Sequence, residues 1–130
     1  MDEIKKILWV DDDDTVLDIF KLKLEKTGRF SVTTTTDGSR IVTLAKEVTP
    51  DVIVTDIKMP FIDGADVANL LKKSEDTKNI PLLFLSSLVS KQEMDATGGF
   101  IGGRHMASKA ASVEEIIAKI DSMLGTKQEA

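Results

Sequence analysis

The stretch PDVIVTDIKMP, residues 50–60, ends a short apolar run with an acid. Val52, Ile53 and Val54 are all β-branched and follow one another without a polar residue. Such a run is typical of a strand that is buried on both faces, as in a parallel sheet. Asp56 follows at the carboxyl end of this predicted strand, where open α/β sheets hold their ligands. We therefore place Asp56 at the centre of a candidate site.

The composition predicts one globular domain of ordinary size. The chain has 130 residues, of which 42% are hydrophobic and 30% are charged. We expect a single domain over residues 1–130, with a core from about 5 to 124 and a frayed tail over 125–130.

Charge and residue usage exclude several classes of function. The net charge of −5 argues against direct binding to nucleic acids or to anionic membranes, which requires basic patches. The chain has no cysteine, so disulfides and thiolate metal sites are excluded. The N-terminal segment is too polar for a signal peptide or a membrane span, so we expect a cytoplasmic location by elimination.

Strand and helix patterns alternate along the chain. Apolar or β-branched runs predict strands at residues 7–10, 30–35, 52–56 and 81–85, and the alternation requires a fifth at 104–108. Apolar residues at helical spacing predict helices from 15 to about 27, over 41–48, from 64 or 65 to 73, and over 113–124. Residues 89–100 predict only a short or irregular element. Alternating strands and helices imply a parallel sheet with helices on both faces.

Polar groups follow four of these predicted strands. The first strand ends in the acidic run 11–14, the third in Asp56, the fourth in Ser86 and the fifth in Lys109. Because the carboxyl ends of parallel strands meet at one edge of the sheet, these groups are expected to converge.

The converging groups suit phosphoryl chemistry. Neighbouring carboxylates repel each other unless a cation neutralises them, and an all-oxygen cluster favours a hard cation such as Mg²⁺. A carboxylate can attack phosphorus and form an aspartyl phosphate. A lysine ammonium and a serine hydroxyl, here Lys109 and Ser86, could then stabilise the equatorial oxygens.

Each residue alone has a simpler role. Asp13 and Asp14 are typical of helix caps, and an acid before a turn is more often a turn former than a nucleophile. His105, the only histidine, is expected to be structural, and no spacing supports a Ser-His-Asp triad. The functional interpretation therefore depends on the whole set of residues.

The set resembles the receiver domain of two-component response regulators over nearly the whole chain. The matching pieces are ILWVDD at residues 7–12, Asp37-Gly38, residues 50–60, Asp63-Gly64, Ser86 and Lys109. The resemblance implies a flavodoxin-like α/β fold, a doubly wound sheet of five parallel strands in the order 2-1-3-4-5. It also implies a bacterial phosphorelay protein that is not an enzyme beyond its own phosphorylation and dephosphorylation.

The resemblance assigns a role to each site residue. Asp56 would accept the phosphoryl group from a sensor histidine kinase or phosphotransfer protein. Mg²⁺ would bind Asp12, Asp56 and the Lys58 carbonyl oxygen directly, and Asp11 through water.

The resemblance also implies a switch. Lys109 would pair with the phosphoryl oxygens, and the Ser86 hydroxyl would swing toward them. That movement would change the face formed by the fourth helix, fifth strand and fifth helix, where a downstream protein would bind, with the chain a monomer or a phosphorylation-dependent dimer.

Four features depart from the family pattern. The family has proline after the lysine, with a cis bond, whereas Ala110 follows Lys109 here and predicts a trans bond. Met106 stands in the place of the family's switch aromatic. Ser87 replaces a small residue, and glycines crowd residues 98–103.

Other functions remain open from the residues. The departures suggest a receiver that no longer switches and acts as a protein-binding module. A Mg²⁺-dependent phosphohydrolase would need a second acid two residues after Asp56, where Lys58 stands. A flavin module would need a phosphate-cradling loop in place of the acidic one.

Overall fold

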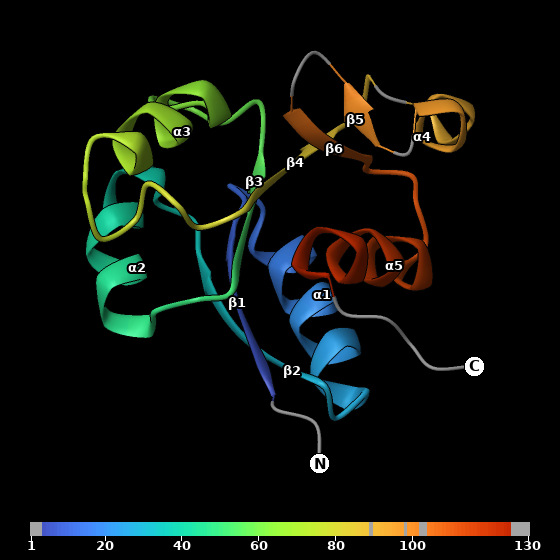
Figure 1. The fold of residues 1–130 in the computed structure, drawn as a ribbon, viewed down its shortest axis with the longest axis horizontal. Coiled ribbons are helices and arrows are strands. Elements are labelled where there is room, and N and C mark those ends of the chain that lie inside the picture. Colours follow the sequence, from blue (N-terminus) through green and yellow to red (C-terminus); the bar gives the residue numbers. More distant parts are fainter. Residues whose placement is uncertain (1–3, 89, 98, 102–103, 126–130) are drawn as a thin grey trace.

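A parallel sheet with helices on both faces forms the centre of the fold (Figure 1). The structure, a computed structural model, describes residues 4–88, 90–97, 99–101 and 104–125. The predicted frayed tail lies outside these residues except for Gly125. The strand order is β2-β1-β3-β4-β6-β5, so β2 (Phe30–Thr35) lies at one edge.

The elements follow the predicted alternation closely. The strands are β1 (Lys5–Val10), β2 (Phe30–Thr35), β3 (Val52–Asp56), β4 (Leu82–Ser86), β5 (Phe100–Ile101) and β6 (Arg104–Ser108). The helices are α1 (Asp14–Lys26), α2 (Ile41–Val48), α3 (Gly64–Lys72), α4 (Lys91–Thr97) and α5 (Val113–Leu124), with a 3₁₀ turn at Gly38–Arg40. The fold class predicted from the sequence is confirmed.

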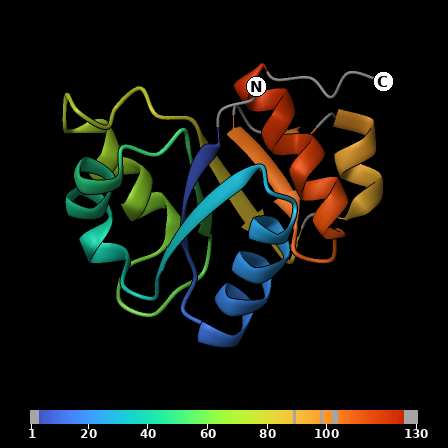
Figure 2. The ribbon, with the colours of Figure 1, turned by 90° about the horizontal axis from the view of Figure 1, so that it is seen from below.

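The two faces of the sheet carry separate apolar cores. On one face, α1 and α5 pack side by side against Ile7, Trp9 and Val54 (Figure 2). On the other face, α2 and α3 pack against Leu8, Val10, Ile53 and further apolar residues. Successive residues of a strand point to opposite faces, so the unbroken apolar runs of β1 and β3 supply both cores.

Side-chain caps fix where the helices begin. The Asp13 carboxylate accepts a hydrogen bond from the Thr15 backbone N–H at 2.9 Å and caps α1. Ser112 and Glu115 form a capping box at the start of α5. None of the helices in the described ranges is both long and apolar enough to cross a membrane.

One strand was not predicted. The sheet has six strands rather than five, because β5 pairs antiparallel with β6 through Phe100↔His105 and Ile101↔Arg104. The Met106 N–H donates to the Gly99 carbonyl at 2.6 Å, and Gly99 adopts a φ of +76° that side chains disfavour. Alternation cannot be recognised in a strand of two residues between glycines. We call β5 and β6 together the edge hairpin.

Candidate functional site

The register of the sheet brings the predicted site residues to one edge. Val10 of β1 pairs with Thr55 of β3, so the residues that follow them, Asp11 and Asp56, end neighbouring strands. Ser86 of β4 pairs with Ser108 of β6, and the Lys109 N–H donates to the Ser86 carbonyl at 3.0 Å. The convergence expected from the sequence is therefore present.

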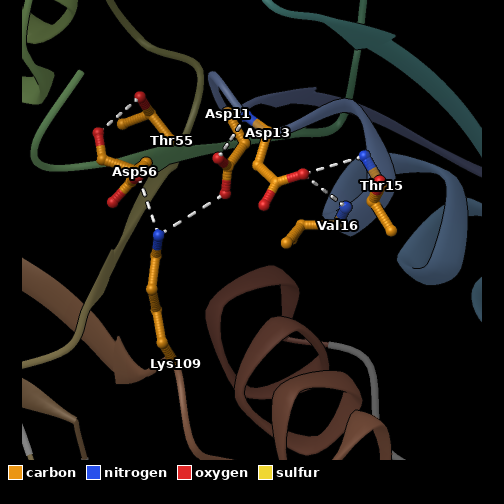
Figure 3. Close-up of polar contacts among 7 residues, drawn as sticks. All are labelled: Asp11, Asp13, Thr15, Val16, Thr55, Asp56 and Lys109. Atoms are coloured by element: carbon orange, nitrogen blue, oxygen red, sulfur yellow. Dashed lines mark hydrogen bonds and ion pairs between the residues drawn. The ribbon is translucent and has the colours of Figure 1, made fainter. Parts of the chain in front are cut away.

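Three carboxylates and one ammonium lie together at this edge. Asp11, Asp12 and Asp56 each offer a carboxylate oxygen, and these oxygens lie within 4.8 Å of one another. The Lys109 Nζ lies 2.8 Å from Asp56 Oδ2 and 3.6 Å from Asp11 Oδ2. Figure 3 shows the Lys109 side chain reaching from beyond β6 to a point between the two acids. We call these four residues the acid pocket.

Asp11 is the most enclosed member of the acid pocket. It has no exposed surface, and its Oδ1 accepts a hydrogen bond from the Asp13 N–H at 3.0 Å. Its buried Oδ2 has no hydrogen-bond partner among the residues that the structure describes. Burial raises the pKa of Asp11, against the opposing effects of the Asp13 N–H and the Lys109 charge. The chain thus holds a buried carboxylate oxygen that lacks a full complement of donors.

Lys109 supplies the positive charge of the acid pocket. Burial lowers the pKa of this lysine, but the attraction of Asp56 and Asp11 outweighs burial, so the pKa is raised overall. Lys109 is therefore a permanent cation at physiological pH. The single positive charge of Lys109 faces the two carboxylates of Asp11 and Asp56. One negative charge is therefore left that a further cation can neutralise.

The residues of the acid pocket fit a magnesium ion. All the offered ligand atoms are oxygens, Asp12 is exposed, and Asp11 Oδ2 is buried without a hydrogen bond. Mg²⁺ is held by one or two carboxylates and keeps several waters, which suits a cluster with one exposed acid. The donor set therefore agrees with the Mg²⁺ expected from the sequence.

The loop after β3 is held tightly beneath Asp56. The Gly64 N–H donates to the Ile57 carbonyl at 2.8 Å. A Cβ at Gly64 would lie 2.8 Å from the Asp56 carbonyl oxygen, so only glycine fits this approach. Asp63 caps α3 in a reciprocal pair with Asp66. Lys58 lies in the same loop with an exposed side chain, and the ligation of Mg²⁺ by its carbonyl oxygen stays a prediction.

The predicted switch residues are in place but apart from the acids. Ser86 is buried, and its hydroxyl oxygen accepts a hydrogen bond from the Leu88 N–H at 3.0 Å. Within the described ranges no hydrogen bond joins Ser86 to Asp56. Met106 lies half-buried on β6 opposite Phe84. The bond between Lys109 and Ala110 is trans, as predicted.

Sequence reasoning missed two buried polar contacts of α5. The Lys119 Nζ lies 3.0 Å from His105 Nδ1, beneath the edge hairpin. Burial lowers the pKa of Lys119, and burial together with the Lys119 charge lowers the pKa of His105. Arg29 pairs with Asp121 at 2.6 Å. The only sign of these contacts in the sequence was that Lys119 and Asp121 flank Ile120 on the apolar face of the predicted helix.

The sheet order and the acid pocket define a class of signalling domain, and comparisons with known proteins identify it. The family model of the response regulator receiver domain matches residues 7–121. The chain belongs to this family, as the resemblance indicated. Receiver domains are signalling domains of two-component systems, and they interact with histidine kinases or phosphotransfer proteins.

Relatives of two lengths match the chain. The chain is 34% identical over 120 residues to the DNA-binding dual master transcriptional regulator RpaA of Synechocystis. The matched region covers 92% of this chain but only 48% of that protein. It is 30% identical to the polar-differentiation response regulator DivK of Brucella ovis, over 93% of this chain and 97% of that one. The chain therefore spans about half the length of several curated relatives and nearly all of another.

Solved structures agree with this assignment. The chemotaxis protein CheY4 of Vibrio cholerae matches with a TM-score of 0.77 and 25% identity, over 93% of this chain and 99% of that one. The likeness covers the parallel sheet and the helices on its two faces, which confirms the flavodoxin-like fold.

Proposed function

We propose that this receiver domain accepts a phosphoryl group on Asp56 in a Mg²⁺-dependent reaction and passes the signal to a protein partner. The observation that carries the proposal is the position of the Asp56 carboxylate. It ends β3 with 5% of its surface exposed, 2.8 Å from the Lys109 ammonium and beside the carboxylates of Asp11 and Asp12. A nearly buried nucleophile with a fixed cation beside it suits attack on phosphorus.

The residues of the acid pocket divide the chemistry. An Asp56 carboxylate oxygen forms a bond to phosphorus while the donor's bond to phosphorus breaks and the donor leaves with the electron pair. Lys109 offers its charge to the equatorial phosphoryl oxygens. Asp11 and Asp12, with Asp56 and the Lys58 carbonyl, would hold the Mg²⁺ ion. When bound, the ion neutralises the carboxylates and the incoming phosphoryl charge.

The output would begin at Ser86. Its hydroxyl accepts the Leu88 N–H, so its proton is available to a phosphoryl oxygen on Asp56 after a rotation about one bond. We propose that this rotation alters the face made by α4, the edge hairpin and α5, where a downstream protein binds. The domain would work in the cytoplasm as a monomer or a phosphorylation-dependent dimer.

Intact-mass spectrometry tests the phosphoryl acceptor. The wild-type chain, incubated with acetyl phosphate and Mg²⁺, is expected to gain the mass of one phosphoryl group, and Asp56→Asn is expected to gain none. Omitting Mg²⁺ should also prevent the gain. An unchanged adduct in Asp56→Asn would contradict the proposal.

A receiver that does not switch is the second candidate. It is favoured by the edge hairpin, which ties the Met106 N–H to the Gly99 carbonyl at 2.6 Å and holds the switch position in a sheet. A beryllofluoride titration followed by NMR separates the two. Shifts that extend from the acid pocket to Met106 support switching, and shifts confined to the acid pocket support a fixed binding module.

A further inference from the structure

Phe61 is the most exposed large apolar side chain that the structure describes. Its relative exposure is 108%, more than that of the extended reference, so the ring touches almost nothing of its own chain. Its φ is +68°, in the left-handed region that bulky residues avoid. The Ile62 N–H donates to the Pro60 carbonyl at 2.7 Å and closes a three-residue turn with Phe61 at its tip. A strained, fully exposed aromatic ring requires a reason outside the fold.

The exposure of Phe61 does not come from a loose loop. Met59 and Ile62, on either side of the turn, are partly buried and pack against the core beneath α2 and α3. Gly64 then anchors the loop against the backbone of Asp56. The turn is fixed at both ends, and the Phe61 ring is the part that is presented to solvent.

The turn at Phe61 lies at the edge of the sheet that holds the acid pocket. Phe61 follows Asp56 by five residues, in the loop at the carboxyl end of β3. On the neighbouring strand β4, Leu88 follows Ser86 by two residues and is 80% exposed. Two exposed apolar side chains therefore lie in loops that follow neighbouring strands, at the sheet edge where Asp56 is only 5% exposed.

A protein phosphodonor has to approach this edge of the sheet. Attack requires the phosphorus to approach Asp56 to within about 3–3.5 Å, and Asp56 lies below the surface made by the loops. A histidine on a folded donor can reach that depth only if the donor surface presses on those loops. A small donor such as acetyl phosphate can enter without touching them.

We propose that Phe61, assisted by Leu88, is the apolar anchor that docks a phosphohistidine protein over Asp56. The inference rests on the proposed function. It requires the donor protein to have an apolar recess beside its phosphohistidine. Aromatic residues at the centre of an interface carry a large share of binding energy. The ring would therefore set the affinity and choice of donor, and leave the chemistry at Asp56 unchanged.

The test compares two donors on the same variants. Phe61→Asn removes the ring, and asparagine tolerates the left-handed backbone, so the turn should persist. The sensor kinases of the source organism, autophosphorylated with labelled ATP, serve as protein donors, and acetyl phosphate serves as the small donor. For the kinase that is fastest with wild type, Phe61→Asn should raise KM about tenfold or more with little change in kcat, a loss of about 1.4 kcal/mol per tenfold. The acetyl phosphate rate should not change.

Two controls define the outcomes. Phe100→Asn removes another exposed phenylalanine, which pairs with His105 at the start of β6, away from Lys109, and it should leave both donors unaffected. Phe61→Trp should keep most of the kinase affinity. Equal KM values for wild type and Phe61→Asn would overturn the inference, as would an equal loss in Phe100→Asn.

Further outcomes separate this inference from the proposed function. If acetyl phosphate labels Asp56 but no kinase in the set does, the docking inference fails and the proposed function stands. If a wild-type dimer dissociates in Phe61→Asn while the kinase KM is unchanged, the ring anchors a second copy of this chain, and the inference also fails. If no donor labels Asp56, the proposed function fails.

Discussion

The acid pocket and the β5 strand of the edge hairpin lie at opposite ends of β6, and the two regions differ in how their residues are held. The acid pocket is built from residues at the carboxyl ends of parallel strands, so the parallel register brings Asp11, Asp56 and Lys109 together. The edge hairpin depends on contacts from elsewhere, including Lys119 of α5 against His105. The register of the central strands therefore positions the residues of the acid pocket. Contacts at the edge of the sheet position the edge hairpin, which belongs to the candidate output face.

This difference predicts that the two regions respond independently to damage. Below the acid pocket, Gly64 lies close to the backbone of Asp56 and Ile57. At the edge hairpin, Gly99 lies close to the Met106 carbonyl oxygen. The same substitution, glycine to alanine, can therefore be applied to each region, and it should lower Mg²⁺ affinity in one region and leave it unchanged in the other.

Gly64→Ala is expected to have the largest effect. The new Cβ would lie 2.8 Å from the Asp56 carbonyl oxygen and 3.0 Å from the Ile57 Cα, so the backbone beneath the acid must move. We expect a loss of about 1–3 kcal/mol in the free energy of unfolding, the usual cost of overpacking. Mg²⁺ affinity should fall with it, measured by the fluorescence of Trp9, the only tryptophan, which lies two residues from Asp11. Wild-type Mg²⁺ affinity in this variant would contradict the account.

Gly99→Ala should destabilise the chain without harming the acid pocket. Its Cβ would lie 2.8 Å from the Met106 carbonyl oxygen and 3.0 Å from the Lys119 Cε, at a φ of +76°. We expect a loss of about 1–2 kcal/mol by chemical denaturation, with Mg²⁺ affinity unchanged. Gly28→Ala is the matched control, because Gly28 has the same φ and no atom within 4 Å of its Cβ. A Gly99→Ala loss no greater than that of Gly28→Ala would show that the hairpin contact is unimportant.

Asp11→Asn should separate stability from metal binding. Burial raises the pKa of Asp11, so the folded state disfavours this charge, and its Oδ2 has no hydrogen bond. Without Mg²⁺, the variant should unfold at a temperature a few degrees higher than wild type. Its Mg²⁺ affinity should fall about tenfold or more, or about 1.4 kcal/mol. A lower unfolding temperature in metal-free buffer would mean that Lys109 already compensates the buried charge.

His105→Gln tests the edge hairpin through pH and should have the smallest effect. The pKa of His105 is lowered by burial and by Lys119, so the unfolded chain binds the proton more readily. The wild type should therefore lose stability as the pH falls below 6.5, the ordinary value for histidine. The variant lacks this proton site, so its stability should fall less between about pH 7 and about pH 5.5. Identical pH dependence in both proteins would remove His105 from the account.

The sequence predicted the acid pocket well because its signals are local. Asp56 and Ser86 end a strand of the sheet, and Asp11 and Lys109 directly follow one. Parallel strands bring these ends together without further information. The first three of those strands, β1, β3 and β4, are buried apolar runs whose patterns are plain in the sequence. Lys109 was placed correctly although its strand, RHMAS, is a poor strand by propensity.

The edge hairpin could not be predicted in the same way. β5 is two residues long, too short for any alternation to be recognised. The Lys119 contact with His105 joins α5 to β6. Lysine and histidine are not residue types that are usually fully buried, so the sequence around them does not indicate this contact. The left-handed turn at Phe61 also has no sequence signal, since phenylalanine rarely adopts that backbone. These features are set by tertiary packing that overrides local preference.

The most direct test of the central claim is to identify the residue that carries the phosphoryl group. The wild-type chain is labelled with acetyl phosphate and Mg²⁺ and then reduced with borohydride, which converts an aspartyl phosphate to homoserine. Peptide sequencing by mass spectrometry should find homoserine at position 56, and none in a sample that was not labelled. Homoserine at Asp11 or Asp12, phosphate on Ser86, or no modification at all would contradict the account.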